Sequence, residues 1–272
     1  KYKAMNIKNL TLKFSLFLIL KLLVLTGFSQ KSDSQMIIDS LYSSYLNESR
    51  AYCLYLPPDF DNQKKYPIIY CADGQVIVEV NYKPLLDSLI SANVINPIIL
   101  IGLYSSERPA PGVNITYRYI EYVKHKGKSN QQIFENHLRF FIDEAPKYIL
   151  NKYNIQEDNS NATFYGCSNG GGFGMTLFLH GGHQYQNFLC YSPLGSAKVL
   201  KKQKKDYPNL YISYGTEEFF VAMEEFSNLT LQLKQKGYDF LSEPYIGGHD
   251  RFEWKKEFCR TISKIYSTEL KK

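Results

Sequence analysis

The strongest constraint on the fold is one glycine-rich stretch near the middle of the chain, Phe164-Tyr165-Gly166-Cys167-Ser168-Asn169-Gly170. The apolar residues that lead into it are typical of a buried strand, and a helical pattern follows it. Between a strand and a helix, Gly-x-Ser-x-Gly is the pattern of a nucleophile elbow, a turn that forces its serine into a strained backbone conformation. The pattern therefore predicts that the Ser168 hydroxyl stands above a sheet. The alternative is an ordinary tight turn between a strand and a helix.

The backbone around this turn is also a candidate for binding negative charge. The Asn169 N–H is expected at a helix N-terminus, where the helix dipole is positive, and a developing oxyanion needs such donors. A second N–H is expected from the loop after the strand that ends at Ala72, where Gly74 and Gln75 are the candidates. The alternative for these two residues is a plain Asp-Gly turn.

Composition narrows the class of protein. The chain has 272 residues, of which 44% are hydrophobic, and this is enough for the core of one α/β domain. Its formal charge of +6 is misleading, because residues 1–29 hold five lysines and no acidic residue. The remainder has 27 basic and 26 acidic residues, so its charge gives no reason to expect a nucleic acid partner.

The N-terminal segment, residues 1–29, is predicted to be a secretory signal. Lysines precede an apolar run at residues 14–25, which Lys21 interrupts, and Gly27-Phe28-Ser29 fits a cleavage site before Gln30. An uncleaved membrane anchor is the alternative, although the run is short for a membrane span. Residues 30–272 are expected to form a single exported domain, periplasmic or secreted, without stable membrane insertion after signal removal. The oligomeric state is left open.

From residue 50 onwards, apolar strand patterns alternate with helical patterns. Strands are predicted at residues 50–58, 66–72, 96–103, 162–166, 187–193, 209–215 and 239–246, and helices at residues 78–92, 131–153, 217–236 and 251–270. Pro146 is expected to kink the second of these helices. The alternation is typical of an α/β fold with a mostly parallel central sheet and helices on both faces.

A serine nucleophile needs a base, and the base needs an orienting acid. In α/β-hydrolases these follow successive strands in the order serine, acid, histidine. Glu217 and Glu218 follow the strand that ends at Gly215, and Glu218 is preferred for its spacing from that glycine. The alternative is that both glutamates only favour a helix N-terminus. His249 follows the last strand, at the edge of the sheet where ligands bind in such folds, and is the candidate base.

The remaining side chains that could carry chemistry have simpler expected roles. His125 is expected in a solvated loop, His137 packed on a helix or facing water, and His180 and His183 at a helix end. The cysteines show no CxxC pair and no zinc-ligand spacing. Their odd number leaves at least one thiol unpaired, and no disulfide pair is assigned.

Five motifs are present between residue 50 and the C-terminus: Leu54-Tyr55-Leu56-Pro57-Pro58, Tyr66-Pro67-Ile68-Ile69-Tyr70 with Asp73-Gly74-Gln75, Arg118-x-x-Glu121-Tyr122, Gly166-x-Ser168-x-Gly170-Gly171, and Gly247-Gly248-His249-Asp250 with Trp254. Together they resemble the putative-esterase family of α/β-hydrolases. That family includes esterase D, feruloyl and acetyl-xylan esterases and enterobactin-type siderophore esterases. The second, third and fifth motifs look closest to the siderophore-esterase branch.

The resemblance implies that Ser168 is the nucleophile and His249 the base, with an oxyanion hole formed by the N–H of Asn169 and that of Gly74 or Gln75. It implies no metal and no organic cofactor. Two features depart from related enzymes. Asp73-Gly74 replaces the His-Gly oxyanion motif of many lipases, and a Glu-Glu pair stands at the position of the acid.

The sequence thus predicts a serine hydrolase that cleaves small-molecule carboxylic esters through an acyl-enzyme, with siderophore, carbohydrate or phenolic esters as candidate substrates. The alternatives are an acyltransferase or peptidase with the same triad, and a non-catalytic binding protein on this scaffold. Arg118, Tyr122 and Trp254 are candidate substrate-binding residues. Their alternative roles are an ion pair between Arg118 and Glu121, and core packing for the two aromatic residues.

The predicted signal can be tested by N-terminal sequencing of the protein recovered from the periplasm or the medium. Cleavage after the small-x-small site should give a first residue at or near Gln30. Recovery of only the uncleaved chain, in the membrane fraction, would favour the anchor.

Overall fold

The computed structural model describes residues 32–110, 114–124, 128–180, 184–196, 198–199 and 207–271. The predicted signal, residues 1–29, and the histidines His125 and His183 lie outside the described residues. Residues Ser34–Lys272 form one compact unit. Within the described residues, none of the helices has the length and apolar character needed to span a membrane.

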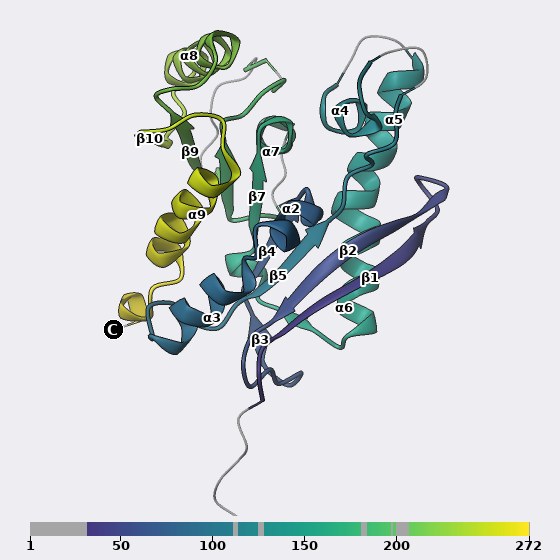
Figure 1. Ribbon diagram of the computed structural model, residues 1–272, viewed down its shortest axis with the longest axis vertical. Coiled ribbons are helices and arrows are strands. Elements are labelled where there is room, and N and C mark those ends of the chain that lie inside the picture. Colours follow the sequence, from purple (N-terminus) through teal and green to yellow (C-terminus); the bar gives the residue numbers. More distant parts are fainter. Residues whose placement is uncertain are drawn as a thin grey trace, which may run out of the picture. The chain divides into compact units, whose positions relative to one another are not determined.

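A mixed sheet with strand order β1-β2-β5-β4-β7-β8-β9-β10 forms the centre of this unit (Figure 1). The antiparallel part consists of β1 (Gln35–Ser43), β2 (Glu48–Leu56) and β5 (Ile99–Leu103). From β5 onwards each strand of the sheet pairs in parallel with the next. These strands are β4 (Ile68–Ala72), β7 (Thr163–Cys167), β8 (Asn187–Tyr191), β9 (Asn209–Gly215) and β10 (Leu241–Tyr245). The predicted α/β fold with a mostly parallel sheet is confirmed. A small second sheet pairs β3 (Lys65–Tyr66) with β6 (Gln156–Glu157).

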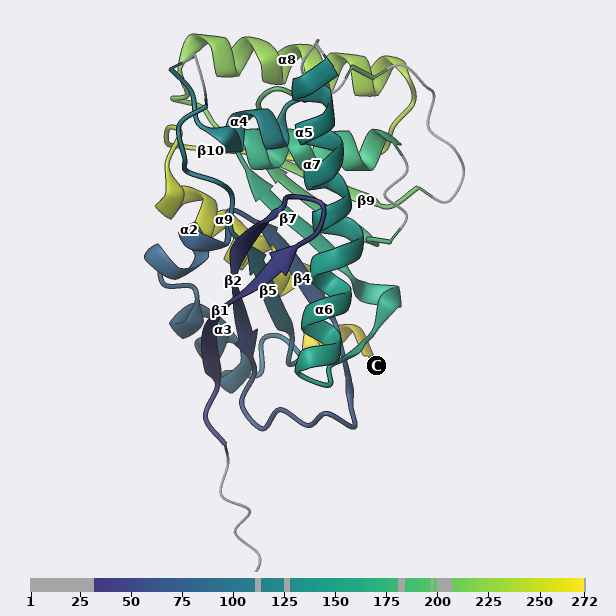
Figure 2. The ribbon, with the colours of Figure 1, turned by 90° about the vertical axis from the view of Figure 1, so that its right-hand side faces the viewer.

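Helices cover both faces of the sheet (Figure 2). One face carries α2 (Gly74–Glu79), α3 (Lys83–Ser91) and α9 (Arg251–Ile265). The other carries α5 (Lys128–Arg139), α6 (Ala145–Lys152), α7 (Asn169–His180) and α8 (Phe220–Gln235). The short helix α4 (Tyr117–Tyr122) packs against α5 and α7.

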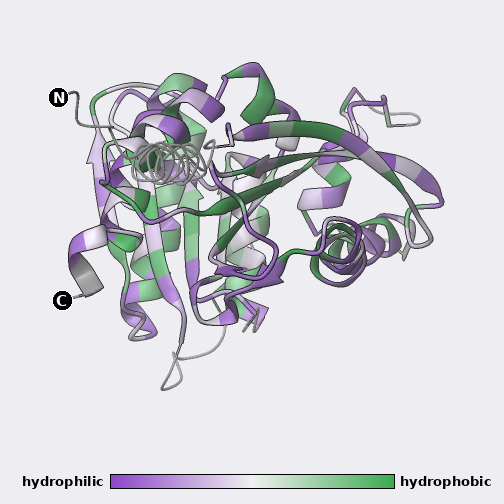
Figure 3. Cartoon of the chain, turned by 90° about the horizontal axis from the view of Figure 1, so that it is seen from below, coloured by the Kyte–Doolittle hydropathy of each residue, from purple (hydrophilic) through white to green (hydrophobic). Residues whose placement is uncertain are grey.

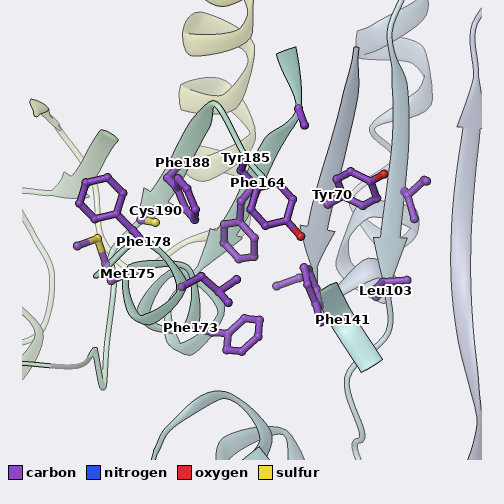
Figure 4. Packing of buried hydrophobic residues seen from close by; sticks show 14 of the residues in the cluster. Tyr70, Leu103, Phe141, Phe164, Phe173, Met175, Phe178, Tyr185, Phe188 and Cys190 are labelled. Atoms are coloured by element: carbon purple, nitrogen blue, oxygen red, sulfur yellow. The ribbon is translucent and has the colours of Figure 1, made fainter. Parts of the chain in front are cut away.

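The two faces bury two separate hydrophobic clusters because side chains alternate along each strand. In β4, Ile68 and Tyr70 belong to the cluster under α5–α7, while Ile69 and Cys71 belong to the cluster under α2, α3 and α9. Figure 3 shows hydrophobic residues along the central strands and mixed stripes on the helices. In the first cluster, Phe164 of β7 lies between the rings of Phe141 and Phe188, at 5.6 and 5.8 Å between centroids (Figure 4).

Two expectations differ from the structure. The helix expected at residues 78–92 is two helices, α2 and α3, separated at Asn81, whose φ of 56° ends the first. The helix expected at residues 131–153 is interrupted by a π-helical segment at Phe140–Glu144, one turn before the expected kink at Pro146. A proline has no N–H and crowds the preceding turn, so regular α-helical bonding cannot continue unchanged up to it. Strand β1 lies before the first predicted strand: Gln35 begins an edge strand whose side chains are mostly solvent-accessible.

His137 of α5 is a buried titratable group. It is 1% exposed, and its ring lies against those of Tyr122 and Phe173 at 5.1 and 5.2 Å. Within the described part of the chain its Nδ1 has no hydrogen-bond partner. Burial lowers the pKa of His137 to about 4; nearby Glu121 opposes this shift and Arg50 adds to it.

We predict that His137→Leu makes stability less dependent on pH between about 6.5 and 4. The folded chain keeps this imidazole neutral, while the unfolded chain protonates it below its ordinary pKa of 6.5. The unfolded state therefore binds more protons in this window, and the free energy of unfolding falls as the pH is lowered, by about 3 kcal/mol for this group. Urea unfolding of both proteins at pH 7 and pH 4.5 measures the effect. The same loss of stability in the variant would show that another group is responsible.

Candidate active site

Ser168 occupies the turn between β7 and α7 with a φ of 55°, in the left-handed region that a non-glycine residue rarely adopts. Three backbone hydrogen bonds hold it there. Its N–H donates to the Tyr191 carbonyl at 2.9 Å, and its carbonyl accepts from Gly172 and Leu194 at 2.9 and 3.0 Å. The strained turn predicted from Gly-x-Ser-x-Gly is present in the structure.

Close backbone packing explains the glycines around this turn. A Cβ on Gly166 would lie 2.4 Å from the Gly170 carbonyl oxygen, and one on Gly172 would lie 1.9 Å from the Leu194 carbonyl oxygen. No other residue fits these positions without moving the backbone. Gly170 is different, because a Cβ there would meet the side chains of Asp73 and Ala72 rather than backbone.

His249 lies in the loop between β10 and α9, and its imidazole contacts both the serine and a carboxylate. Its Nε2 is 2.9 Å from Ser168 Oγ, and its Nδ1 is 2.6 Å from Glu218 Oε2. The ring packs edge-on against Trp254, with centroids 4.7 Å apart. The next residue, Asp250, caps α9 by accepting from the N–H of Phe252, which fixes the end of the loop.

Glu218 has a buried carboxylate, with a side chain 2% exposed. Its second oxygen accepts from the Ser192 hydroxyl, which in turn accepts from Trp254 Nε1 at 2.9 Å. Burial raises the pKa of Glu218, but the hydrogen bonds from His249 and Ser192 outweigh it, so the pKa lies below its usual value. Glu217 is exposed. Its backbone N–H donates to the Gly247 carbonyl at 2.9 Å. The carboxylate that contacts His249 is that of Glu218.

The loop after β4 holds the other candidate donors. Asp73 has a φ of 57°, and α2 begins at Gly74, so the first N–H groups of that helix have no partner inside it. A Cβ on Gly74 would lie 2.2 Å from the Gly102 carbonyl oxygen, so the loop rests directly on β5. Gln75 lines the cavity above Ser168, and its side-chain amide donates to Ser105 Oγ at 2.7 Å. Asn169 likewise begins α7.

The three candidate substrate-binding residues have different environments. Arg118 pairs with both carboxylate oxygens of Asp73, at 2.6 and 2.8 Å, and not with Glu121. Glu121 instead pairs with Arg50 at 2.7 Å, so the alternative role considered for Arg118, an ion pair with Glu121, is wrong. The expected substrate contact of Tyr122 is also contradicted: the residue is 1% exposed, and its hydroxyl accepts from the Asp73 N–H at 3.0 Å. Trp254 lines the cavity.

A cavity of about 320 Å³ opens over Ser168 and His249, a volume that suits a small organic molecule. Its walls come from the loop after β4, from α2 and from the first turn of α9. Several of these wall residues were not predicted from the sequence, namely Val76, Ile77, Tyr82, Glu107, Tyr165, Cys167 and Arg251. Ser192 was not predicted either, because it falls inside the strand expected at residues 187–193, whereas β8 ends at Tyr191.

Cys167 stands next to Ser168 on the cavity wall but is not a comparable nucleophile. Burial raises the pKa of its thiol well above the usual value. The reactive thiolate is therefore suppressed at neutral pH. None of the chain's five cysteines forms a disulfide.

A family model described as Putative esterase matches residues 43–265. The chain belongs to the Putative esterase family. Membership of this family identifies it as a carboxylic ester hydrolase. The uncharacterized protein YjcH of Bacillus subtilis is 23% identical over 240 residues, which cover 82% of this chain and 94% of YjcH.

Solved structures of other esterases share the fold. A ferulic acid esterase superimposes with a TM-score of 0.71 at 19% identity, covering 86% of this chain and 98% of its own. The enterobactin esterase FES from Shigella flexneri superimposes with a TM-score of 0.65 at 15% identity, covering 85% of this chain and 59% of its own. At sequence identities this low, the superpositions show a shared fold alone.

The unequal surroundings of the two glutamates generate a prediction. Glu218→Gln should lower kcat by about 10²-fold or more, because a triad in which the acid is replaced by its amide loses up to about 10⁴-fold. Glu217→Gln, the matched control, should stay within about twofold of the wild type, because exposed substitutions have small effects. Steady-state kinetics on p-nitrophenyl acetate measures both. The reverse ranking would move the role to Glu217, and no effect from either would indicate a Ser-His dyad.

Proposed function

We propose that this enzyme hydrolyses small-molecule esters through a covalent acyl-enzyme on Ser168, with His249 as general base and Glu218 as the orienting acid. The observation that carries this proposal is the continuous chain of contacts from Ser168 Oγ through the imidazole to Glu218, at 2.9 and 2.6 Å. These contacts lie beside a cavity that Ser168 and His249 line. A hydroxyl, a base and a buried acid in this order are the parts of a serine-hydrolase triad.

In the first half of the reaction, Ser168 Oγ attacks the ester carbonyl carbon while its proton passes to His249 Nε2. The carboxylate of Glu218 stabilises the imidazolium through Nδ1–H. The carbonyl oxygen, now negative, accepts from the N–H of Asn169 and from that of Gly74 or Gln75. The tetrahedral intermediate then collapses. The C–O bond to the alcohol breaks, His249 returns its proton to the leaving oxygen, and the acyl group stays on Ser168.

In the second half, water replaces the alcohol. His249 takes one proton from the water as its oxygen attacks the acyl carbon, and the same backbone donors receive the new oxyanion. Collapse breaks the bond to Ser168 Oγ, which recovers its proton from His249. The products are one carboxylic acid and one alcohol, and the enzyme returns to its initial state.

For the substrate, we propose esters of aromatic acids that carry polar ring substituents. The cavity wall combines aromatic and apolar surface from Tyr82, Trp254 and Ile77 with the charged side chain of Arg251. Aromatic walls pack well against a planar ring, and arginine binds phenolic or anionic oxygen. The ferulic acid and enterobactin esterases that share this fold support the same class by their names. A panel of phenolic, acetylated-sugar and catecholate esters would rank these alternatives.

The central prediction is that Ser168 and His249 act as a unit. Ser168→Ala, His249→Ala and the double variant should have similar residual rates on p-nitrophenyl acetate, about 10⁴- to 10⁶-fold below wild-type kcat. The losses should not multiply, because both residues serve the same proton-transfer step. Circular dichroism should show all three variants folded, since neither side chain belongs to the hydrophobic core.

Labelling by a fluorophosphonate gives an independent measurement, because the reagent should modify the wild type and leave Ser168→Ala unmodified. A folded His249→Ala variant with near-normal rates would contradict the assignment of the base. His180, which lies at the end of α7, would then be tested next.

A further inference from the structure

The side chain of Arg118 forms hydrogen bonds with side chains from both segments whose backbone is proposed to supply the oxyanion donors. Its Nε and Nη2 donate to the two carboxylate oxygens of Asp73, the residue directly before Gly74. Its Nη1 donates to Asn169 Oδ1 at 3.3 Å. Arg118 itself comes from α4, outside the strand-end loops that carry Ser168, Glu218 and His249. One guanidinium therefore bridges two loops that follow neighbouring strands, β4 and β7 (Figure 1).

The Asp73 backbone needs such support because it is strained. Its φ of 57° places a non-glycine residue in the left-handed region, at a cost of about 1–3 kcal/mol. This conformation sets the direction of the following N–H groups, those of Gly74 and Gln75. Contacts from outside the loop hold it: the pair with Arg118, a hydrogen bond from Ser105 Oγ at 2.8 Å, and the Tyr122 hydroxyl that accepts the Asp73 N–H at 3.0 Å.

The charge of Asp73 gives the pair a second effect. The carboxylate side chain is 9% exposed and lines the cavity that contains Ser168. An unpaired carboxylate there would repel the negative charge that develops on the substrate oxygen. Arg118 neutralises it with two parallel hydrogen bonds, the geometry in which an arginine–carboxylate pair is strongest. Burial would lower the pKa of Arg118, but Asp73 raises it above its usual value, so the guanidinium remains charged.

Arg118 is not needed simply to attach α4 to the sheet. Three residues further on, Glu121 pairs with Arg50 of β2 at 2.7 Å, and both side chains are at least 95% buried. This second pair has the same chemistry as the first and belongs to the same helix. Arg50 also donates to Glu48 and to the Tyr104 carbonyl, and within the described residues none of its hydrogen bonds reaches Asp73, Asn169 or Ser168. The Arg50–Glu121 pair thus anchors α4 without contacting the oxyanion segments, and it is a matched control for the Arg118–Asp73 pair.

We propose that Arg118 is a positioning residue for transition-state stabilisation: it fixes the Asp73 loop and the start of α7 so that their N–H groups converge on one oxyanion. The inference rests on the proposed acyl-enzyme function. It assigns Arg118 a role that differs from binding the substrate. Because the donors matter only once the oxygen carries charge, loss of Arg118 should affect the transition state far more than the bound substrate.

The test compares Arg118→Lys with Arg50→Lys. Lysine keeps the positive charge but cannot bind both Asp73 oxygens and Asn169 at once. Arg118→Lys should lower kcat on p-nitrophenyl acetate by about 10- to 100-fold, less than the 10²- to 10³-fold loss for deleting a donor outright. KM should change by less than about threefold, because ground-state binding is spared. Arg50→Lys should leave kcat within about threefold of wild type, whatever its effect on the melting temperature.

Binding of phenylboronic acid supplies a readout that a purely structural role would not change. The boronate forms a tetrahedral adduct with Ser168 and resembles the transition state, so its affinity for Arg118→Lys should fall in proportion to kcat/KM. The shape of the pH profile of kcat/KM should match that of the wild type. Asn169→Ala, which keeps the Asn169 N–H but removes the contact with Arg118, should show a smaller loss of the same kind.

Three outcomes would overturn the inference. A rise in KM with unchanged kcat would make Arg118 a substrate contact. Equal losses of kcat in the two lysine variants would make it an anchor for α4. Unchanged boronate affinity in a folded Arg118→Lys or Asn169→Ala variant would remove the link to the oxyanion. Failure of the proposed function is separate, because it would appear as a wild-type enzyme no more active than Ser168→Ala.

Discussion

The left-handed backbone at Ser168 is the constraint on which the rest of the site depends. Such a conformation costs about 1–3 kcal/mol and persists only where the surroundings determine it. Here β7, β8 and α7 converge on the turn so closely that side chains are excluded from Gly166 and Gly172. The serine is therefore placed by the packing of the sheet and the helix, and its position is set before any substrate binds.

The order of the strands then arranges the other groups around this point. In the sheet, β7 is flanked by β4 on one side and by β8, β9 and β10 on the other (Figure 1). The loop after β4 brings backbone N–H groups, while the loops after β9 and β10 bring Glu218 and His249. Three adjacent strands, β4, β7 and β8, are each followed by a non-glycine residue with positive φ: Asp73, Ser168 and Ser192, at 57°, 55° and 42°. Strain is thus concentrated along one edge of the sheet, where the chemistry is proposed.

Sequence patterns were sufficient for the parts of the molecule that local rules determine. Gly-x-Ser-x-Gly predicted the strained turn, and the alternation of strands and helices predicted a mostly parallel sheet with His249 and Glu218 at its edge. The pairing of Arg118 with Asp73 could not be predicted in the same way, because it joins residues 45 positions apart and depends on where α4 packs. The nearer partner, Glu121, pairs instead with Arg50 of β2, a contact between distant parts of the chain that local spacing does not reveal. Ser192 was missed because the apolar pattern placed it inside the strand expected at residues 187–193, and β8 ends one residue before it.

The peptide between Tyr191 and Ser192, at the end of β8, has a consequence for the precision of the site. The Tyr191 carbonyl accepts the N–H of the nucleophile, and the Ser192 hydroxyl donates to the acid. A small thermal displacement of β8 therefore carries the serine and the glutamate in the same direction, and the distance that the imidazole must bridge changes little. The base is tied to the same point, because Tyr245 of β10 and Trp254, on which the imidazole packs, both contact the Ser192 hydroxyl. The end of β8 is thus a common reference for all three groups of the site, although it supplies none of them.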